Sequence, residues 1–283
     1  MDRLVIGCGY LGLQVAKRWL RAGDNVLAMT RSPERAERLK ALGIEPMIAD
    51  VSVASTLEQL PDAKTVLYAV GFEPWQKGNA AETYLAGFRN VLTKLPPQTG
   101  QLIYISTTGV YGGYQGDWIT ESTPVAPSRP SSQACLLAET ELQQSPWWER
   151  SVILRLAGIY GAGRIPNRSK IENREWSELS PQGYVNLIHV DDAALIVQQV
   201  ANMRMGQETF LVADGNPPCR TDFYEYIAER LGVGPICWDN LVETESLQGR
   251  SANKRISNSR LLERTGVVLG FPDFRKGIDQ ALI

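Results

Sequence analysis

Three glycines near the start of the chain have the spacing that a bound pyrophosphate requires. The apolar run 3–6 leads into Gly7-x-Gly9-x-x-Gly12, and a helix-compatible run follows. Gly7 allows a tight turn, Gly9 removes the side chain that would block the phosphates, and Gly12 lets the helix pack close to the strand. The N–H groups and the dipole at the helix start attract phosphate charge. A purely structural turn is the alternative, but the flanking strand and helix favour a dinucleotide site formed by Gly7, Gly9, Tyr10, Leu11 and Gly12.

The residues after the expected second strand, 26–29, indicate which nicotinamide cofactor would bind. An acidic side chain there accepts the ribose hydroxyls, whereas a basic one accommodates an additional 2′-phosphate. Arg31 and Ser32 follow this strand, and the first carboxylate after it is Glu34. Both Arg31 and Ser32 can donate to a phosphate, so NADP(H) is favoured and NAD(H) is the alternative. The competing interpretation is that Arg31 is a solvated surface residue and that Ser32 only caps the next helix.

The ends of three further strands supply the other expected cofactor contacts. Asp50 and Val51 follow the third strand, where the carboxylate could accept from the adenine amino group and Val51 could pack on the ring. Capping of the next helix is an equal alternative for Asp50. Ala69 follows the fourth strand, and its small side chain would let the cofactor approach the sheet. Ser106, at the end of the fifth strand, is the last of the expected cofactor-binding residues.

Composition and charge exclude several classes of function. The chain has 283 residues, 43% of them hydrophobic, and a net charge of −2, which gives no basic surface for nucleic acid. The sequence contains no uncharged apolar stretch long enough to span a membrane. The first strand begins almost at Met1, so we expect no signal peptide. Four scattered cysteines and one histidine argue for reduced thiols without a metal site, so we expect a cytoplasmic protein.

Strands and helices alternate along the first half of the chain. Such alternation implies right-handed crossovers and a parallel sheet covered on both faces, which is a doubly wound α/β Rossmann fold. The pattern loosens after about residue 160, where 161–181 is polar and favours a loop. We expect a Rossmann domain over 1–160 and, over 161–283, a small substrate lobe with some elements that return to the sheet. The expected strands are 4–6, 26–29, 44–49, 66–70, 102–105 and 152–156, and the expected helices include 80–95 and 131–144.

Three more stretches point to one family. They are Ile105-Ser-Thr-Thr-Gly-Val-Tyr-Gly112, Arg155-Leu-Ala-Gly-Ile-Tyr-Gly161 and Ile188-His-Val-Asp-Asp-Ala-Ala194. With the glycine motif they resemble the extended short-chain dehydrogenase/reductase superfamily, in its NAD(P)-dependent epimerase/dehydratase group, over roughly residues 1–200. The resemblance implies a site in which Ser/Thr, Tyr and Lys act together. In that family Tyr exchanges a proton with the substrate oxygen as hydride moves to or from nicotinamide, and Lys, four residues later, holds the ribose and lowers the Tyr pKa.

The chain departs from this family pattern at the Tyr and Lys. Thr107 fills the Ser/Thr position, with Ser106 beside it. Matching Pro130 and Glu139 to the family frame places Ser131 where Tyr belongs and Cys135 where Lys belongs. No Tyr occurs between residues 114 and 160, and no Lys between residues 94 and 170. The sequence therefore resembles an atypical member with a degenerate catalytic pair.

Other groups could replace the lost proton donor. Tyr111 follows Thr107 on the same strand-end loop and is the first candidate, although packing is the more common role of this tyrosine. Cys135 lies in an apolar helical stretch and His189 is expected to be structural. Gly158 stands where sugar-nucleotide members carry Asn, which argues against nucleotide-sugar substrates. Lys254 or Arg255, near the C-terminus, could also reach the substrate cleft.

Two functions from different classes remain open. One is an NADP(H)-binding oxidoreductase or epimerase-like enzyme acting on a small carbonyl or alcohol, with Thr107 and Tyr111 as catalytic candidates. The alternative is a non-catalytic NADP(H)-binding sensor or scaffold, which the missing Tyr and Lys would suit. The resemblance also leaves open a homodimer formed through helices 80–95 and 131–144.

Overall fold

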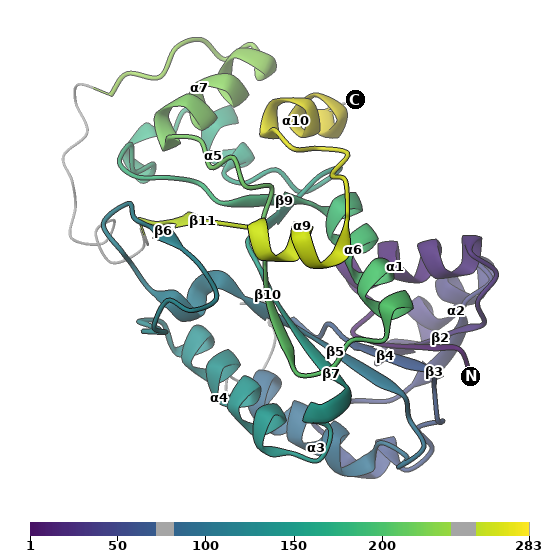
Figure 1. Ribbon diagram of the computed structural model, residues 1–283. Coiled ribbons are helices and arrows are strands. Elements are labelled where there is room, and N and C mark those ends of the chain that lie inside the picture. Colours follow the sequence, from purple (N-terminus) through teal and green to yellow (C-terminus); the bar gives the residue numbers. More distant parts are fainter. Residues whose placement is uncertain (72–81, 239–252, 283) are drawn as a thin grey trace.

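A seven-stranded parallel sheet forms the centre of the computed structural model, which describes residues 1–71, 82–238 and 253–282 (Figure 1). The strand order is β10-β7-β5-β4-β1-β2-β3. Val, Ile and Leu fill the middle strands, which are buried on both faces, as parallel sheets require. The strands are β1 (Arg3–Ile6), β2 (Val26–Thr30), β3 (Glu45–Ile48), β4 (Thr65–Tyr68), β5 (Gln101–Thr107), β7 (Ser151–Leu156) and β10 (Glu208–Val212).

Helices cover both faces of this sheet (Figure 1). One face carries α1 (Tyr10–Arg21) and α6 (Val190–Met203), which pack on each other and on the sheet through one hydrophobic core. The other face carries α3 (Gly87–Lys94) and α4 (Pro130–Gln144), which share a second core around Phe88 and Tyr104. The remaining helices near the sheet are α2 (Pro33–Ala41) and α9 (Ser259–Thr265).

The chain builds the sheet outward in two directions from β1. It adds β2 and β3 on one side and then β4, β5, β7 and β10 on the other. Ligands of doubly wound folds bind where this direction reverses, beyond the carboxyl ends of the strands. The fold therefore places the residues that follow β1, β2, β4 and β5 around one crevice.

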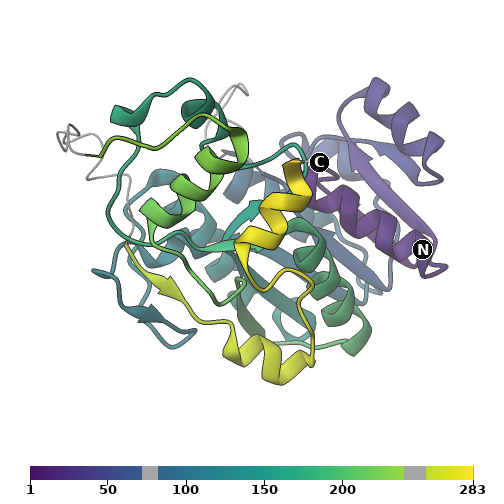
Figure 2. The same ribbon diagram turned by 90° about the horizontal axis from the view of Figure 1, so that it is seen from above.

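A smaller lobe with its own hydrophobic core lies beside the sheet. Its helices are α5 (Arg168–Glu172), α7 (Arg220–Leu231) and α10 (Phe274–Leu282). Two short parallel pairs join it to the rest: β8 (Gly158–Tyr160) with β9 (Leu187–His189), and β6 (Trp118–Ile119) with β11 (Arg255–Ile256). Figure 2 shows the N-terminal elements in purple at one end of the molecule and the green lobe helices toward the other. The division at residue 160 stays a proposal, because β10 and α6 come from beyond it and join the sheet.

The expected Rossmann fold is confirmed, with differences at the boundaries of elements. The segment 161–181, expected to be a loop, contains the short helix α5. The expected strand 44–49 is β3 (Glu45–Ile48), and the expected helix 131–144 begins at Pro130. The expected helix 80–95 is a π-helical turn, Glu82–Ala86, followed by α3, and its first residues lie outside the described part of the chain. No helix among the described residues is long and apolar enough to span a membrane.

Candidate functional site

The glycine turn after β1 exposes the first N–H groups of α1. Gly7 has a φ of +95°, and a Cβ there would lie 2.5 Å from the backbone carbon of Ala69. A Cβ at Gly12 would lie 2.3 Å from the carbonyl oxygen of Gly7. The fold itself thus requires both of these glycines. At Gly9 an added Cβ would meet nothing within 4 Å, so this position is open for a ligand to approach the backbone.

The start of α1 is suited to an anion. Gly9 is its N-cap residue and has no side chain to bind the free N–H groups. The first turn contains no acidic residue that would compete for them. Helix N-termini with free N–H groups attract phosphate through hydrogen bonds and the helix dipole. A dinucleotide pyrophosphate therefore fits this turn.

One cavity of about 1230 Å³ extends along the carboxyl ends of the strands. It brings together most of the residues that the sequence singled out, from the glycine turn to the end of β5. Gly12, Ser32 and Tyr111 are outside its lining. The expected site residues that line it are Gly7, Gly9, Tyr10, Leu11, Arg31, Asp50, Val51, Ala69, Ser106 and Thr107.

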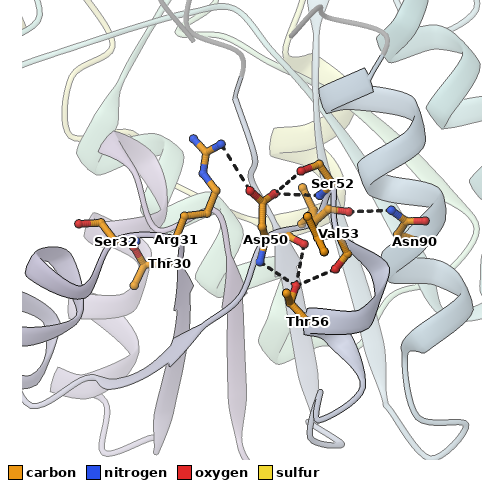
Figure 3. A network of polar contacts seen from close by, with 9 residues as sticks. Thr30, Arg31, Ser32, Asp50, Ser52, Val53, Thr56 and Asn90 are labelled. Atoms are coloured by element: carbon orange, nitrogen blue, oxygen red, sulfur yellow. Dashed lines mark hydrogen bonds and ion pairs between the residues drawn. The ribbon is translucent and has the colours of Figure 1, made fainter. Parts of the chain in front are cut away.

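At the end of β2, Arg31 faces Asp50 at the end of β3 (Figure 3). Their closest nitrogen and oxygen atoms are 3.8 Å apart, and the Arg31 side chain is 57% exposed. This separation is too long for a hydrogen bond. Asp50 therefore leaves the N–H donors of the Arg31 guanidinium available to a ligand. Ser32 instead caps α2, because its hydroxyl accepts from the backbone N–H of Arg35 at 3.2 Å. Arg35, which no sequence motif indicates, also lines the cavity.

Asp50 has a local structural role in addition to its place in the cavity. Its Oδ1 accepts hydrogen bonds from the backbone N–H and the hydroxyl of Ser52, at 2.9 and 2.7 Å (Figure 3). The backbone of the same turn is held by Thr56, whose hydroxyl donates to the Asp50 and Val53 carbonyls. Val51 is buried, and its carbonyl accepts from Asn90 at 2.8 Å. The turn thus presents Asp50 and Val51 in a fixed conformation.

At the end of β5, Thr107 lies in the cavity. Its hydroxyl oxygen accepts a hydrogen bond from the backbone N–H of Gly109 at 3.0 Å. This bond orients the side chain and leaves the hydroxyl hydrogen as the group that Thr107 can donate. Of the two catalytic candidates, Thr107 is therefore the one placed where a ligand could contact it.

Ser106 and Tyr111 are tied to a buried ionic network. The Ser106 hydroxyl donates to Glu139, and Glu139 pairs with Arg155 at 2.6 Å. Arg155 in turn donates to the Tyr111 hydroxyl at 2.6 Å. Tyr111 is fully buried, and its burial raises the pKa of its hydroxyl. Tyr111 therefore resembles a packing residue more than a proton donor to a ligand in the cavity.

Helix α4 presents Ser131 and Cys135 to the cavity, the two residues that we expect from the sequence in place of the family's Tyr and Lys. The two are four residues apart and so share one face of the helix. Burial raises the pKa of the Cys135 thiol to about 12, which keeps the thiol neutral near pH 7. Neither residue replaces the acidity of a phenol or the charge of an ammonium group.

His189 caps α6, and Asp192, in the first turn of that helix, binds the segment that precedes α10. His189 is buried, and its Nδ1 accepts from the backbone N–H of Asp191 at 3.3 Å. Burial lowers its pKa, which favours the neutral ring. Asp192 accepts from the backbone N–H groups of Gly270 and Phe271, both at 2.8 Å. These contacts support the structural role expected for His189.

Of the two C-terminal cations that the sequence suggests for the cleft, Lys254 lines the cavity and Arg255 does not. Arg220, which no sequence motif indicates, lines it too. Its place there depends on the packing of α7 against α5, which no local pattern around Arg220 encodes.

Comparison with known proteins gives a consistent result. Residues 3–213 match the model of the NAD dependent epimerase/dehydratase family. Protein YeeZ of Escherichia coli K12 is 26% identical over 277 residues, which cover 95% of this chain and 96% of that protein. A 4-hydroxy-2-methyl-3-oxo-4-farnesyl-3,4-dihydroquinoline-1-oxide ketoreductase of Stigmatella aurantiaca is 23% identical, over 80% of this chain and 72% of that protein.

The fold also matches solved structures. A short-chain dehydrogenase/reductase superfamily protein from Agrobacterium tumefaciens, solved with bound NAD, superposes with a TM-score of 0.81. The match covers 100% of this chain and 96% of the other, at 16% identity. At that identity the likeness shows the fold.

Proposed function

Because this chain belongs to the NAD dependent epimerase/dehydratase family, we propose that it is an NADP(H)-dependent oxidoreductase acting on a small carbonyl or alcohol. The observation that carries the proposal is that one cavity joins the glycine turn, Arg31 and Thr107. The ketoreductase relative, 23% identical, supports carbonyl chemistry. A bound nicotinamide would supply or accept the hydride.

The residues present fit this cofactor along its length. The open backbone at Gly9 and the free N–H groups of α1 suit the pyrophosphate. Arg31 and Arg35, both in the cavity lining, are the donors that we assign to the 2′-phosphate. Asp50 and Val51 are assigned to the adenine, and Ala69 allows close approach to the sheet. The preference for NADP(H) over NAD(H) rests on the two arginines, since a phosphate dianion gains most from charge-assisted bonds.

We assign to Thr107 the binding of the reacting oxygen of the substrate. Its hydroxyl hydrogen can donate to that oxygen while the Gly109 N–H holds its own oxygen in place. Positioning of reactants can lower a barrier by roughly 7–11 kcal/mol, whereas a positioned acid or base typically contributes about 10²–10⁴ in rate. Loss of the Tyr and Lys therefore slows turnover without preventing hydride transfer. The proton then comes from solvent or from a weaker donor such as Ser131.

Cofactor titration tests the proposal directly. Wild-type protein is titrated with NADPH and with NADH, and binding is followed by nucleotide fluorescence. We expect NADPH to bind at least about tenfold more tightly, because a charge-assisted contact contributes about 1.5–3 kcal/mol. In Arg31→Ala most of this preference should disappear, with NADH affinity nearly unchanged.

The matched control is Arg21→Ala. Arg21 is an exposed arginine in the last turn of α1 and lies outside the cavity lining. The Arg21→Ala variant should bind NADPH and NADH with wild-type affinity. Tighter binding of NADH than of NADPH by the wild type, or an Arg31→Ala protein with an unaltered preference, would refute the assignment to NADP(H).

A further inference from the structure

Arg220 and Lys254 contribute two cations from distant parts of the chain to one cavity wall. Arg220 is the first residue of α7, and Lys254 immediately precedes β11. Both line the same cavity as Tyr224 and Asn167. Lys254 is 4% exposed, so its ammonium group is almost fully withdrawn from bulk water. Neither residue belongs to the glycine turn or to the strand ends assigned to the cofactor.

The positive charge of this wall is not balanced by carboxylates of the described residues. Within 1–71, 82–238 and 253–282, neither Arg220 nor Lys254 forms an ion pair. The described acidic residues that line the cavity are Asp50, which faces Arg31, and Glu178, which binds Lys170 at 2.8 Å.

The surroundings of both cations disfavour their charged forms. Burial lowers the pKa of Lys254 to about 8 and also lowers the pKa of Arg220. Repulsion from the charge of Arg129 lowers both pKa values further.

Several donors on this wall also lack acceptors. The Nε of Arg220 is buried and has no hydrogen-bond partner among the described residues. Lys254 donates to the carbonyl of Gly112 at 2.7 Å, which uses one of its three hydrogens. The hydroxyl of Tyr224 accepts from Asn167 at 3.1 Å, so its own hydrogen is the group that it can donate. A buried donor without an acceptor is rare and costly in native proteins.

A ligand with a negatively charged oxygen group would satisfy both the charge and the donors. Carboxylate and phosphate oxygens accept several hydrogen bonds and pair well with guanidinium and ammonium groups. We propose that Arg220 and Lys254 bind the anionic end of the substrate, so that the protein acts on small carbonyl or alcohol compounds that bear a carboxylate or a phosphate. This inference rests on the proposed function and names its substrate class.

The first test measures anion binding in the presence of saturating NADPH, which fills the cofactor's own phosphate sites. Inorganic phosphate and malonate are titrated separately at constant ionic strength, and binding is measured by isothermal titration calorimetry. We expect one of the two to bind at a single site, which also identifies the preferred anion. In Arg220→Gln and Lys254→Met its Kd should rise at least about tenfold, as expected for removal of one charge-assisted contact.

The matched control is Arg168→Gln. Arg168 is exposed, pairs with Glu172 at 2.8 Å and lies outside the cavity lining. It should leave the anion affinity unchanged. If neither anion binds to a protein that binds NADPH normally, or if Arg220→Gln and Lys254→Met bind as tightly as the wild type, the anion subsite is wrong. Should Lys254→Met fail to fold, Arg220→Gln decides, because the buried Nε of Arg220 has no hydrogen-bond partner among the described residues and its removal breaks no such bond.

The second test compares turnover of matched neutral and anionic compounds with NADPH. The pairs are butanone with 2-oxobutyrate, and dihydroxyacetone with its phosphate. We expect the anionic member of at least one pair to have a kcat/KM at least about tenfold higher, and we expect Arg220→Gln to remove that advantage. Faster turnover of both neutral members would refute the inference and leave the proposed function intact. A wild-type protein that does not bind NADPH would instead refute the proposed function.

Discussion

Arg155 donates a 2.6 Å hydrogen bond from its Nη1 to the hydroxyl of Tyr111, and both side chains are buried. The same guanidinium binds Glu139 through Nε and Nη2. The tyrosine hydroxyl is thus an acceptor within an ionic network and is not directed to a ligand. We therefore propose a structural role for Tyr111 in place of the catalytic one that its sequence position allowed.

Removal of this hydroxyl tests the assignment. In Tyr111→Phe the buried Arg155 loses an acceptor, so we expect the free energy of unfolding to fall by about 1–3 kcal/mol. NADPH affinity and kcat should stay within about threefold of the wild type, because the hydroxyl is outside the cavity lining. Urea unfolding and steady-state kinetics check the two expectations. If folded Tyr111→Phe lost about 10²-fold or more in kcat, the structural assignment would be wrong and Tyr111 would have a catalytic role.

The two glycines of the turn after β1 should respond differently to the same change. In Gly9→Ala the added Cβ meets no protein atom within 4 Å, so the melting temperature should be unchanged while NADPH affinity falls at least about tenfold. In Gly7→Ala the Cβ would lie 2.5 Å from the backbone of Ala69, at a φ of +95°. That variant should lose about 1–3 kcal/mol of stability. Calorimetric melting and fluorescence titration distinguish them, and unaltered NADPH binding by Gly9→Ala would contradict the pyrophosphate assignment.

Thr107→Ala tests the binding of the reacting oxygen. Removal of a donor that contacts the reacting oxygen typically reduces kcat by about 10²–10³-fold, and we expect a loss of about 10²-fold with little change in the Kd for NADPH. Thr107→Ser keeps the hydroxyl and should retain most of the activity. The measurement uses whichever carbonyl compound the wild type reduces fastest. Wild-type kcat in Thr107→Ala would exclude this role.

Asp214 should make stability depend on pH. Burial raises its pKa from 3.8 to about 7, and its Oδ2 has no partner among the described residues. Between about pH 4 and pH 7 the folded protein therefore binds a proton that the unfolded chain has lost, so the free energy of unfolding falls as pH rises through this range and levels off above it. Asp214→Asn removes the effect and should gain as much as about 4 kcal/mol relative to the wild type at pH 8, with little gain near pH 4.

Urea unfolding at several pH values measures this difference. Asp62→Asn, a change of an exposed carboxylate, is the control. It should leave the wild-type pH dependence unchanged. A constant difference between Asp214→Asn and the wild type across the pH range would mean that Asp214 is ionised in the folded protein.

The parts of the fold that depend on short stretches of sequence could be predicted. The turn at Gly7, the cap of α2 by Ser32 and the alternation of strands and helices each follow from residues a few positions apart. The sequence likewise shows that α4 contains no tyrosine and no lysine, and that it carries Ser131 and Cys135. Both ends of β3 and the start of α4 differed by one residue, because the last hydrogen bonds of an element depend on its neighbours.

The sequence by itself determined the sheet, the glycine turn and the residues at the strand ends, because local backbone requirements and hydrophobic periodicity specify them. Only the tertiary structure decided which polar groups line the cavity and which are hydrogen-bonded to other residues in the core. Arg155 reaches Tyr111 across 44 positions of sequence, and Lys254 reaches Gly112 across 142. Such contacts form when distant elements pack, and no pattern within one element encodes them.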